Sequence, residues 1–174
     1  MKPDRLMTLC AASLLFGTFN APAMARDLSS APPNAPVISP DGSLYREFGG
    51  HDGLVRIMDD LFVNINADSR IAPFFEPAKI PHIKAMLVEQ VCEITGGGCT
   101  YSGRDMAKVH GELGIKQADF FALVEDLQKA MDSNHVSMAA QDRLLAALAP
   151  QSRVIIYKPG TPDPITSPPA APAQ

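Results

Sequence analysis

A glycine-rich run that ends in a single histidine most constrains how this chain can fold. Residues 96–110 read GGGCTYSGRDMAKVH and lie between two long stretches with helical periodicity. Glycine lets a backbone turn where other residues cannot. This run can therefore leave one helix and carry His110 toward the space between helices. The sequence predicts a helical protein in which a long link presents one imidazole.

Apolar residues recur at steps of three and four in four stretches, which is typical of amphipathic helices. The four stripes are Leu54, Ile57, Met58, Leu61, Phe62 and Ile65; Ile80, Ile83, Leu87, Val91 and Ile94; Phe120, Leu123, Val124, Leu127 and Met131; and Leu144, Leu145 and Leu148. Pro81 suits a first helical turn, and Ser137 is a candidate N-cap for the fourth helix. The fold class is therefore all-α, and a plain four-helix bundle would satisfy the pattern. The long link from Gly96 to Lys116 does not suit a simple bundle.

The two ends of the chain differ in composition from its middle. Residues 1–25 have a basic start, a short apolar run and a final Ala-Met-Ala, which predicts a cleaved signal peptide; an uncleaved anchor is the alternative. Residues 26–42 are rich in proline and alanine and predict a flexible linker, and residues 159–174 predict a disordered proline-rich tail. One domain is expected at residues 43–158. Export predicts a periplasmic or secreted bacterial protein with no membrane anchor after cleavage.

The charge balance argues against nucleic acid as a partner. The full chain has 15 basic and 19 acidic residues. Removing residues 1–25 takes away Lys2, Arg5 and Asp4, which leaves 13 and 18 and a net charge of −5. Binding to phosphate backbones needs a basic face, and this composition offers no excess of positive charge to form one.

Two cysteines remain after the predicted cleavage, Cys92 and Cys99. Their short separation across a glycine-rich turn permits a disulfide in an oxidising compartment. Two separate buried thiols are the alternative. There is no C-x-x-C-H motif, so a haem would not be attached in the usual c-type way.

The order of motifs resembles the group 1 truncated haemoglobins, a family of bacterial globins. The proximal region of that family has a Gly-Gly pair, an aromatic residue, a further Gly, a spacer and the iron-binding His, which Gly96 to His110 match. The remaining matches, in chain order, are Gly49-Gly50, Asp59 to Phe62, Ala67 to Arg70, Pro73-Phe74-Phe75, Ile80 to Thr95, Gly114-Ile115, Asp119 to Phe121 and Leu145 to Pro150. Each motif is only moderately specific, but their order and spacing are strong evidence of the resemblance.

The resemblance implies a two-over-two helical sandwich that encloses haem b, with His110 as the proximal iron ligand. A neutral imidazole suits haem iron, whereas a capping or surface histidine is the ordinary alternative for His110. The residues implied to contact the cofactor are Phe62, Phe75, Ile83, Met86, Leu87, Val91 and Ile115. An apolar helix face without any cofactor would explain most of the same residues.

The distal side departs from the family pattern. Many group 1 members have tyrosine where Phe62 stands and glutamine where Leu87 stands, and these donors hydrogen-bond bound dioxygen. Gln90 is the only donor near Met86 and Leu87 in this sequence. A lost hydrogen bond of this kind costs about 1.5–3 kcal/mol, roughly tenfold to a hundredfold in affinity. Tight oxygen storage is therefore not expected.

Met86 falls where some truncated globins supply a sixth iron ligand, but a core residue that fills a gap is the favoured interpretation. The favoured function is a haem protein that reversibly binds a diatomic gas, O2, NO or CO, at a five-coordinate iron. The alternative is a haem redox protein with a redox partner, in electron transfer or as a nitric oxide dioxygenase or peroxidase-like enzyme. A haem-free helical binding domain is the third reading.

Overall fold

The computed structural model describes residues 35–157, which form helices joined by turns and loops. The signal peptide predicted at residues 1–25 and the tail predicted at residues 159–174 lie outside the described residues. No strand occurs within residues 35–157. In chain order the α-helices are α1 (Ser43–Glu47), α2 (Gly50–Ala67), α3 (Ile80–Ile94), α4 (Met106–His110), α5 (Gln117–Ser133), α6 (Met138–Leu148) and α7 (Ser152–Ile155).

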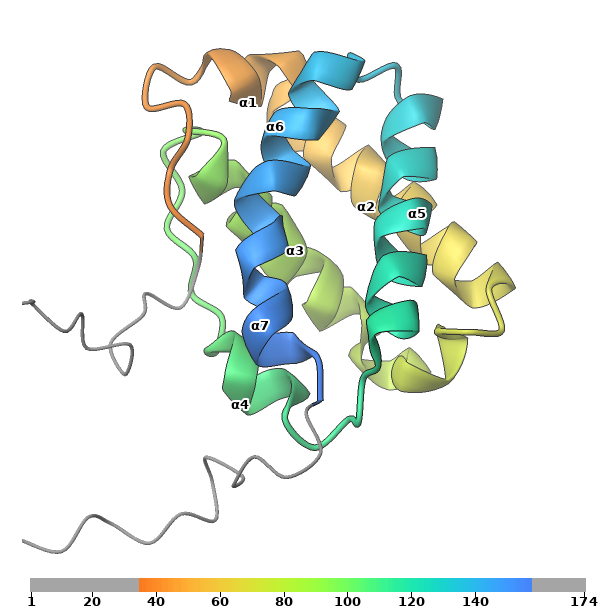
Figure 1. The fold of residues 1–174 in the computed structure, drawn as a ribbon. Helices are drawn as coiled ribbons and strands as arrows, with labels where there is room; N and C mark the ends of the chain where they lie inside the picture. The colour runs from red at the N-terminus through yellow and green to blue at the C-terminus, as the bar shows by residue number, and fades with distance from the viewer. Residues whose placement is uncertain (1–34, 158–174) are drawn as a thin grey trace, which may run out of the picture. The chain divides into compact units, whose positions relative to one another are not determined.

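Two pairs of helices build the core of the domain, α2 with α3 and α5 with α6. α2 packs against both α3 and α5, while α6 contacts α3 and α5. Figure 1 shows α5 and α6 in front of α2 and α3. The inward face of α2 is almost completely buried and holds Leu54, Ile57, Met58, Leu61, Phe62 and Ile65, the first stripe of the sequence analysis. The predicted all-α, two-over-two fold is confirmed.

The helix ends follow from local sequence chemistry. The Ser137 hydroxyl accepts a hydrogen bond from the Ala140 backbone N–H at 3.2 Å, so the predicted N-cap of α6 is present. Pro81 lies in the first turn of α3, where its missing N–H costs nothing. Pro150 lies in a 3₁₀ turn, Ala149–Gln151, that separates α6 from α7. The apolar residues after Pro150 therefore begin a short separate helix instead of extending α6.

The link between α3 and α5 contains a short helix that the sequence analysis treated as loop. α4 spans Met106–His110 and packs mainly against α7. Its N-cap is Asp105, whose side chain accepts from the Lys108 backbone N–H at 3.2 Å. Five residues are too few to show a helical period in the sequence, which is why α4 was not predicted.

Residues 35–42, which the sequence analysis assigned to a flexible linker, contact the C-terminal end of α3. The Ile38 backbone N–H donates to the Ile94 carbonyl at 2.9 Å, and Ser39 is buried. The Ser39 hydroxyl also accepts from the Leu44 backbone N–H at the start of α1. The part of the chain that packs on the helices therefore begins before residue 43, the predicted domain boundary.

Within residues 35–157, the helices are too short or too polar for any of them to cross a lipid bilayer.

Candidate functional site

His110 is the last residue of α4, and two contacts fix where α4 lies. α4 packs against α7. Just after α4, the Ile115 carbonyl accepts a hydrogen bond from the Tyr157 backbone N–H at 2.7 Å, at the end of the described chain. In Figure 1 the two short helices α4 and α7 lie together below the long helices. The histidine is thus presented by a helical turn that is held from the C-terminal side of the domain.

The imidazole ring of His110 is oriented by its own helix. Nδ1 lies 2.8 Å from the Met106 carbonyl oxygen, one turn earlier. A carbonyl oxygen can only accept a hydrogen bond, so this contact assigns the proton of the neutral ring to Nδ1. Nε2 then carries the lone pair, and it has no hydrogen-bond partner among the described residues. A ring fixed through Nδ1 with Nε2 free is the arrangement of a metal-ligating histidine.

Burial of the His110 ring also favours its neutral form. The ring is half-buried, and removal from water lowers the pKa of His110 below its ordinary value, although the hydrogen bond to Met106 acts in the opposite direction. A neutral imidazole is the form that binds a metal. The environment therefore holds the His110 imidazole in its neutral form near neutral pH.

The lowered pKa of His110 predicts a pH-dependent stability of the haem-free protein. In the unfolded chain the His110 side chain has its ordinary pKa of 6.5, so as pH falls it takes up a proton before the folded protein does. The contribution of His110 to the free energy of unfolding is therefore fully present above pH 6.5 and is lost as pH falls through the folded-state pKa. Urea unfolding between about pH 5 and pH 8 should show the free energy rising with pH, with a smaller slope in His110→Gln. Equal slopes in the two proteins would contradict this assignment.

The predicted cofactor-contact residues fall into two groups by burial. Phe62, Val91 and Ile115 are buried. Phe75, Ile83, Met86 and Leu87 are only partly buried. These four side chains therefore leave apolar surface that the rest of the protein does not cover. Such a surface is chemically suited to a flat apolar cofactor.

The structure brings some of these residues into direct contact. The Phe62 and Phe75 rings meet edge to face with centroids 5.5 Å apart. Phe75, Ile83 and Leu87 pack against the hydrophobic core. Val91 is itself part of that core. Of the residues predicted to contact the cofactor, Phe62 and Phe75 thus touch each other, and Ile83, Leu87 and Val91 share the same core.

Met86 and Gln90 point to other neighbours. The Met86 sulfur accepts a hydrogen bond from the Ser102 hydroxyl at 3.9 Å, in the link that precedes α4. The Gln90 amide nitrogen donates to the Gln151 side-chain oxygen at 3.4 Å, beyond α6. The one polar side chain that the sequence analysis considered as a distal donor is therefore directed toward the C-terminal part of the domain.

Two sets of contacts near the site were not found from the sequence. The Lys84 ammonium lies 5.6 Å from the Phe62 ring centroid and 2.7 Å from a carboxylate oxygen of Asp59. The Glu89 carboxylate accepts from both the backbone N–H and the hydroxyl of Ser102. Both sets join different elements, so no local spacing indicates them. Only the Asp105 cap of α4 had a usable signal, an acidic residue at the start of a short helix.

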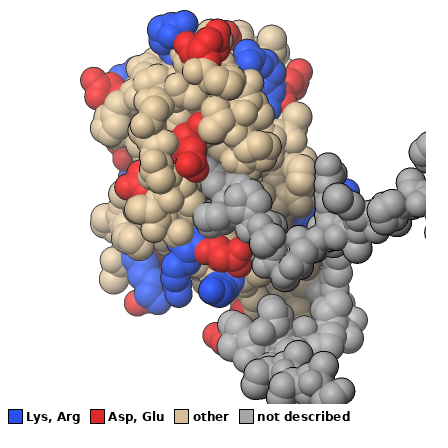
Figure 2. All heavy atoms as spheres, turned by 90° about the vertical axis from the view of Figure 1, so that its left-hand side faces the viewer, with Lys and Arg blue, Asp and Glu red and all other residues tan. Residues whose placement is uncertain are grey.

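The rest of the described surface offers no competing metal centre. Among residues 35–157, no group of three or more His, Cys, Asp or Glu side chains is arranged to hold a metal ion. A single oriented imidazole fits a metal that arrives with its other ligands already in place, as the iron of a porphyrin does. Figure 2 shows the face that carries the link between α3 and α4: most of it is uncharged, and basic and acidic side chains are interspersed.

The sequence is similar to known globins. The Bacterial-like globin family model matches residues 43–156. The group 1 truncated haemoglobin of Nostoc sp. is 33% identical over 106 residues, which are 59% of this chain and 90% of that protein. The group 1 truncated haemoglobin of Mycolicibacterium paratuberculosis is 29% identical over 108 residues, which are 62% of this chain and 79% of that protein.

Solved structures agree on the fold. The truncated haemoglobin of Tetrahymena pyriformis in its Fe(III) form superposes with a TM-score of 0.62 at 19% identity, over 66% of this chain and 98% of that one. The 2/2 haemoglobin of Synechococcus sp., in the cyanomet state with covalently attached haem, gives 0.59 at 21% identity, over 64% and 97%. The chain therefore belongs to the bacterial-like globin family.

Proposed function

We propose that this chain binds haem b and that Nε2 of His110 would hold its iron. The observation that supports this most strongly is the His110 ring itself, which donates through Nδ1 to Met106 and keeps Nε2 free. Membership of the globin family and likeness to truncated haemoglobins support the same cofactor. When bound, haem would supply an iron that can take up a diatomic gas.

The other residues of this proposal bind the cofactor through apolar contact. Phe75, Ile83 and Leu87 are half-buried and would lose their remaining exposure against a porphyrin face. Phe62, Val91, Met86 and Ile115 would complete the apolar surroundings. Burying such surface stabilises by about 25 cal/mol per Å², and excluding water protects ferrous iron from side reactions. These side chains would therefore contribute to the binding affinity for haem and exclude water, while His110 would supply the ligand to the iron.

The proposed function is reversible binding of a diatomic gas, with CO and NO favoured relative to O2. The sequence has Phe62 and Leu87 at the positions that the family resemblance assigns to distal donors, and the Gln90 amide is engaged with Gln151. Dioxygen bound to iron is partly charged and gains most from a hydrogen-bond donor. CO gains less, so an apolar distal side lowers O2 affinity selectively.

Gas release rates test this function through Phe62→Tyr, which adds one hydroxyl beside Phe75. We expect O2 dissociation from the haem-loaded variant to slow by about tenfold to a hundredfold, because the hydroxyl donates to the partly charged ligand. CO dissociation should change far less. Stopped-flow measurement of both gases gives the comparison, with Phe62→Leu as the apolar control. No reversible gas binding by the native protein would overturn the function, and parallel changes for both gases would overturn the donor argument.

A haem redox role is less well supported by the contacts of Met86. Thioether ligation opposite His110 would raise the reduction potential and suit electron transfer. The Met86 sulfur is instead directed at Ser102, 3.9 Å away. Dioxygenase or peroxidase-like turnover would in addition need a redox partner or positioned acid–base groups. We therefore place gas binding before redox chemistry.

The proposed location is the bacterial periplasm or the cell exterior. The support within the described residues is a disulfide between Cys92 and Cys99, because such bonds persist in oxidising compartments. The signal peptide predicted from residues 1–25 agrees with this location.

A further inference from the structure

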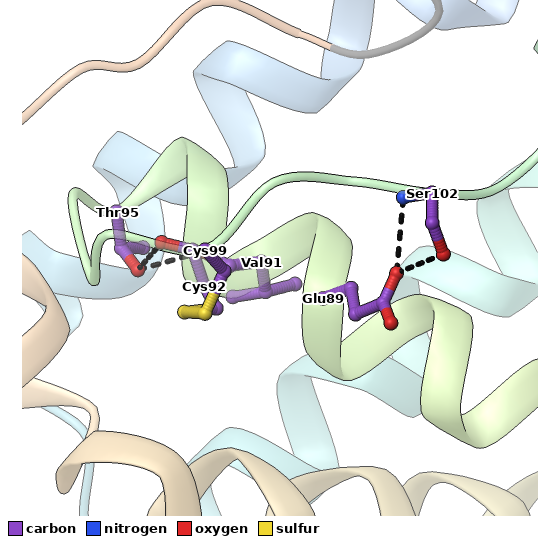
Figure 3. Close-up of a disulfide and its surroundings, with 6 residues drawn as sticks. All are labelled: Glu89, Val91, Cys92, Thr95, Cys99 and Ser102. Atoms are coloured by element: carbon purple, nitrogen blue, oxygen red, sulfur yellow. Dashed lines mark hydrogen bonds between the residues drawn. A yellow bond between two sulfur atoms is a disulfide. The ribbon is translucent and has the colours of Figure 1, made fainter.

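The segment between α3 and α4 is fastened to α3 at two of its residues, Cys99 and Ser102 (Figure 3). Cys92 of α3 forms a disulfide with Cys99, with Cα atoms 5.7 Å apart. The Glu89 carboxylate accepts from the Ser102 backbone N–H at 3.0 Å and from its hydroxyl at 2.6 Å. The same hydroxyl lies 3.9 Å from the Met86 sulfur. We call residues 99–102 the strap, because they run alongside α3 and are attached to it.

The strap leads directly to the helix that carries His110. Only residues 103 and 104 separate Ser102 from Asp105, the N-cap of α4. α4 packs mainly against α7. The strap is therefore the covalent and hydrogen-bonded connection between α3 and the start of α4. On the proposed function, these two helices supply the distal and proximal sides of the haem.

The two cysteines of the disulfide differ in exposure. A groove of about 520 Å³ lies between α2 and α3, lined by Val55 and Met58 of α2, Ala85 and Val88 of α3, and Cys99 and Thr100 of the strap. Cys99 is partly exposed, whereas Cys92 is fully buried and does not line the groove. A reagent in the groove would thus meet Cys99. A groove of this size accommodates a small molecule.

We propose that the Cys92–Cys99 disulfide is a redox modification site, reduced by a low-molecular-weight thiol that enters the α2–α3 groove, and that reduction loosens the helix carrying His110. This inference about the haem side rests on the proposed function. The partner is a small thiol because Cys99 is only partly exposed and is reached through a groove that small molecules fit.

The chemistry is two successive thiol–disulfide exchanges. A thiolate attacks the Cys99 sulfur, forms a mixed disulfide with it, and breaks the bond to Cys92, whose sulfur leaves as a thiolate and takes up a proton. A second thiolate attacks the outer sulfur of the mixed disulfide and releases the Cys99 thiolate, which is protonated. Two small thiols are oxidised to one small disulfide, and one protein disulfide is reduced to two thiols.

Reduction removes the disulfide cross-link that ties the strap to the side of α3. The Glu89–Ser102 hydrogen bonds remain, but they are exposed, and exposed hydrogen bonds open readily. α4 then keeps its packing on α7 while its N-terminal attachment to α3 weakens. The disulfide state thereby sets how firmly the His110 turn is held.

The cysteine that the small thiol attacks first can be identified in the native protein. Treatment with reduced glutathione, acid quenching and peptide mass spectrometry should locate the mixed disulfide on Cys99. In the single variants, the Cys99 thiol of Cys92→Ala should react with glutathione disulfide about tenfold faster than the Cys92 thiol of Cys99→Ala. A mixed disulfide found first on Cys92, or equal reactivity of the two thiols, would overturn the proposed route. Reduction by a protein dithiol alone would overturn the assignment to small thiols.

The effect on α4 is measured by hydrogen exchange of the peptide that contains Met106 to His110, in the oxidised and glutathione-reduced proteins. We expect exchange about tenfold faster after reduction, with an α5 peptide unchanged as the internal control. Ser102→Ala, which removes the hydroxyl contacts to Glu89 and Met86 and leaves only the backbone hydrogen bond to Glu89, should enlarge the increase. Unchanged exchange at α4 would overturn the proposal.

Measuring both haem-free and haem-loaded protein separates this inference from the proposed function. If hydrogen exchange in α4 speeds up on reduction but no haem binds, the proposed function is wrong and the redox proposal stands. If haem and CO bind but reduction changes neither the exchange of α4 nor the rate of haem loss, the redox proposal is wrong and the proposed function stands.

Discussion

Replacing His110 with alanine is expected to weaken haem binding by at least about 100-fold, because even residues that only orient a metal ligand contribute tenfold to a hundredfold in affinity. His110 is the ligand in this account, with its ring held by the Met106 carbonyl and Nε2 free. Competition of the purified protein with apomyoglobin for haem measures the change. The haem-free variant should unfold at nearly the native urea concentration, because the ring is only half-buried.

His82→Ala is the matched control, because His82 is exposed on α3 and should be replaceable without effect. His110→Gly provides a further test, since added imidazole should enter the space left by the side chain and restore haem binding. A His110→Ala protein that keeps native haem affinity would contradict the assignment of the ligand. Equal losses in His82→Ala would show that the effect is not specific to His110.

The second large effect is expected for Gly96→Ala, which should lower the free energy of unfolding by about 3 kcal/mol. Gly96 has φ of +83°, and a left-handed conformation costs a residue with a side chain roughly 1–2 kcal/mol. A Cβ at this position would also lie 1.8 Å from the Ser39 carbonyl oxygen. Ser39 cannot retreat easily, because it is buried next to Ile38, which is hydrogen-bonded to Ile94. The resulting overpacking adds about 1–3 kcal/mol.

Gly98→Ala separates the two causes. Gly98 has φ of +78°, but a Cβ there would have no atom within 4 Å. Its loss should therefore be about 1–2 kcal/mol, from backbone conformation alone. Urea unfolding of both haem-free variants, with the disulfide intact, provides the comparison. Equal losses would show that the contact between Gly96 and the segment before α1 does not stabilise the domain.

Much of the fold could be predicted from the sequence because the helices follow from patterns among residues close together in the chain. The stripe from Leu54 to Ile65 predicted α2, and Ser137 predicted the start of α6. These signals depend on residues within one or two turns of each other. α4 has five residues and no repeating period, so only its Asp105 cap could have indicated it.

The contacts of residues 35–42 with α3 were not predictable for a different reason. Their composition is that of a linker, and the pairing of Ile38 with Ile94 joins residues far apart in the chain. Composition reports the average tendency of a segment, whereas docking depends on the surface it meets. The proline-rich composition therefore gave no sign of this contact with α3.

The candidate site was predictable in its residue types and not in its geometry. His110 was identified by its place after the glycine run and by resemblance to a family. Its hydrogen bond to the Met106 carbonyl depends on the helical form of α4, which the sequence did not indicate. The disulfide was left open because spacing permits a bridge without placing two sulfur atoms together; the structure pairs Cys92 with Cys99.

The central claim, that His110 holds a haem whose other axial position is open to a gas, is tested most directly by the visible spectrum of the purified protein, reduced without oxygen and then exposed to CO. We predict a five-coordinate, high-spin ferrous spectrum that shifts on CO addition in the native protein and in His82→Ala. A six-coordinate, low-spin spectrum would contradict the open position and point to an internal ligand such as Met86. Failure to form any stable haem band would contradict the haem assignment itself.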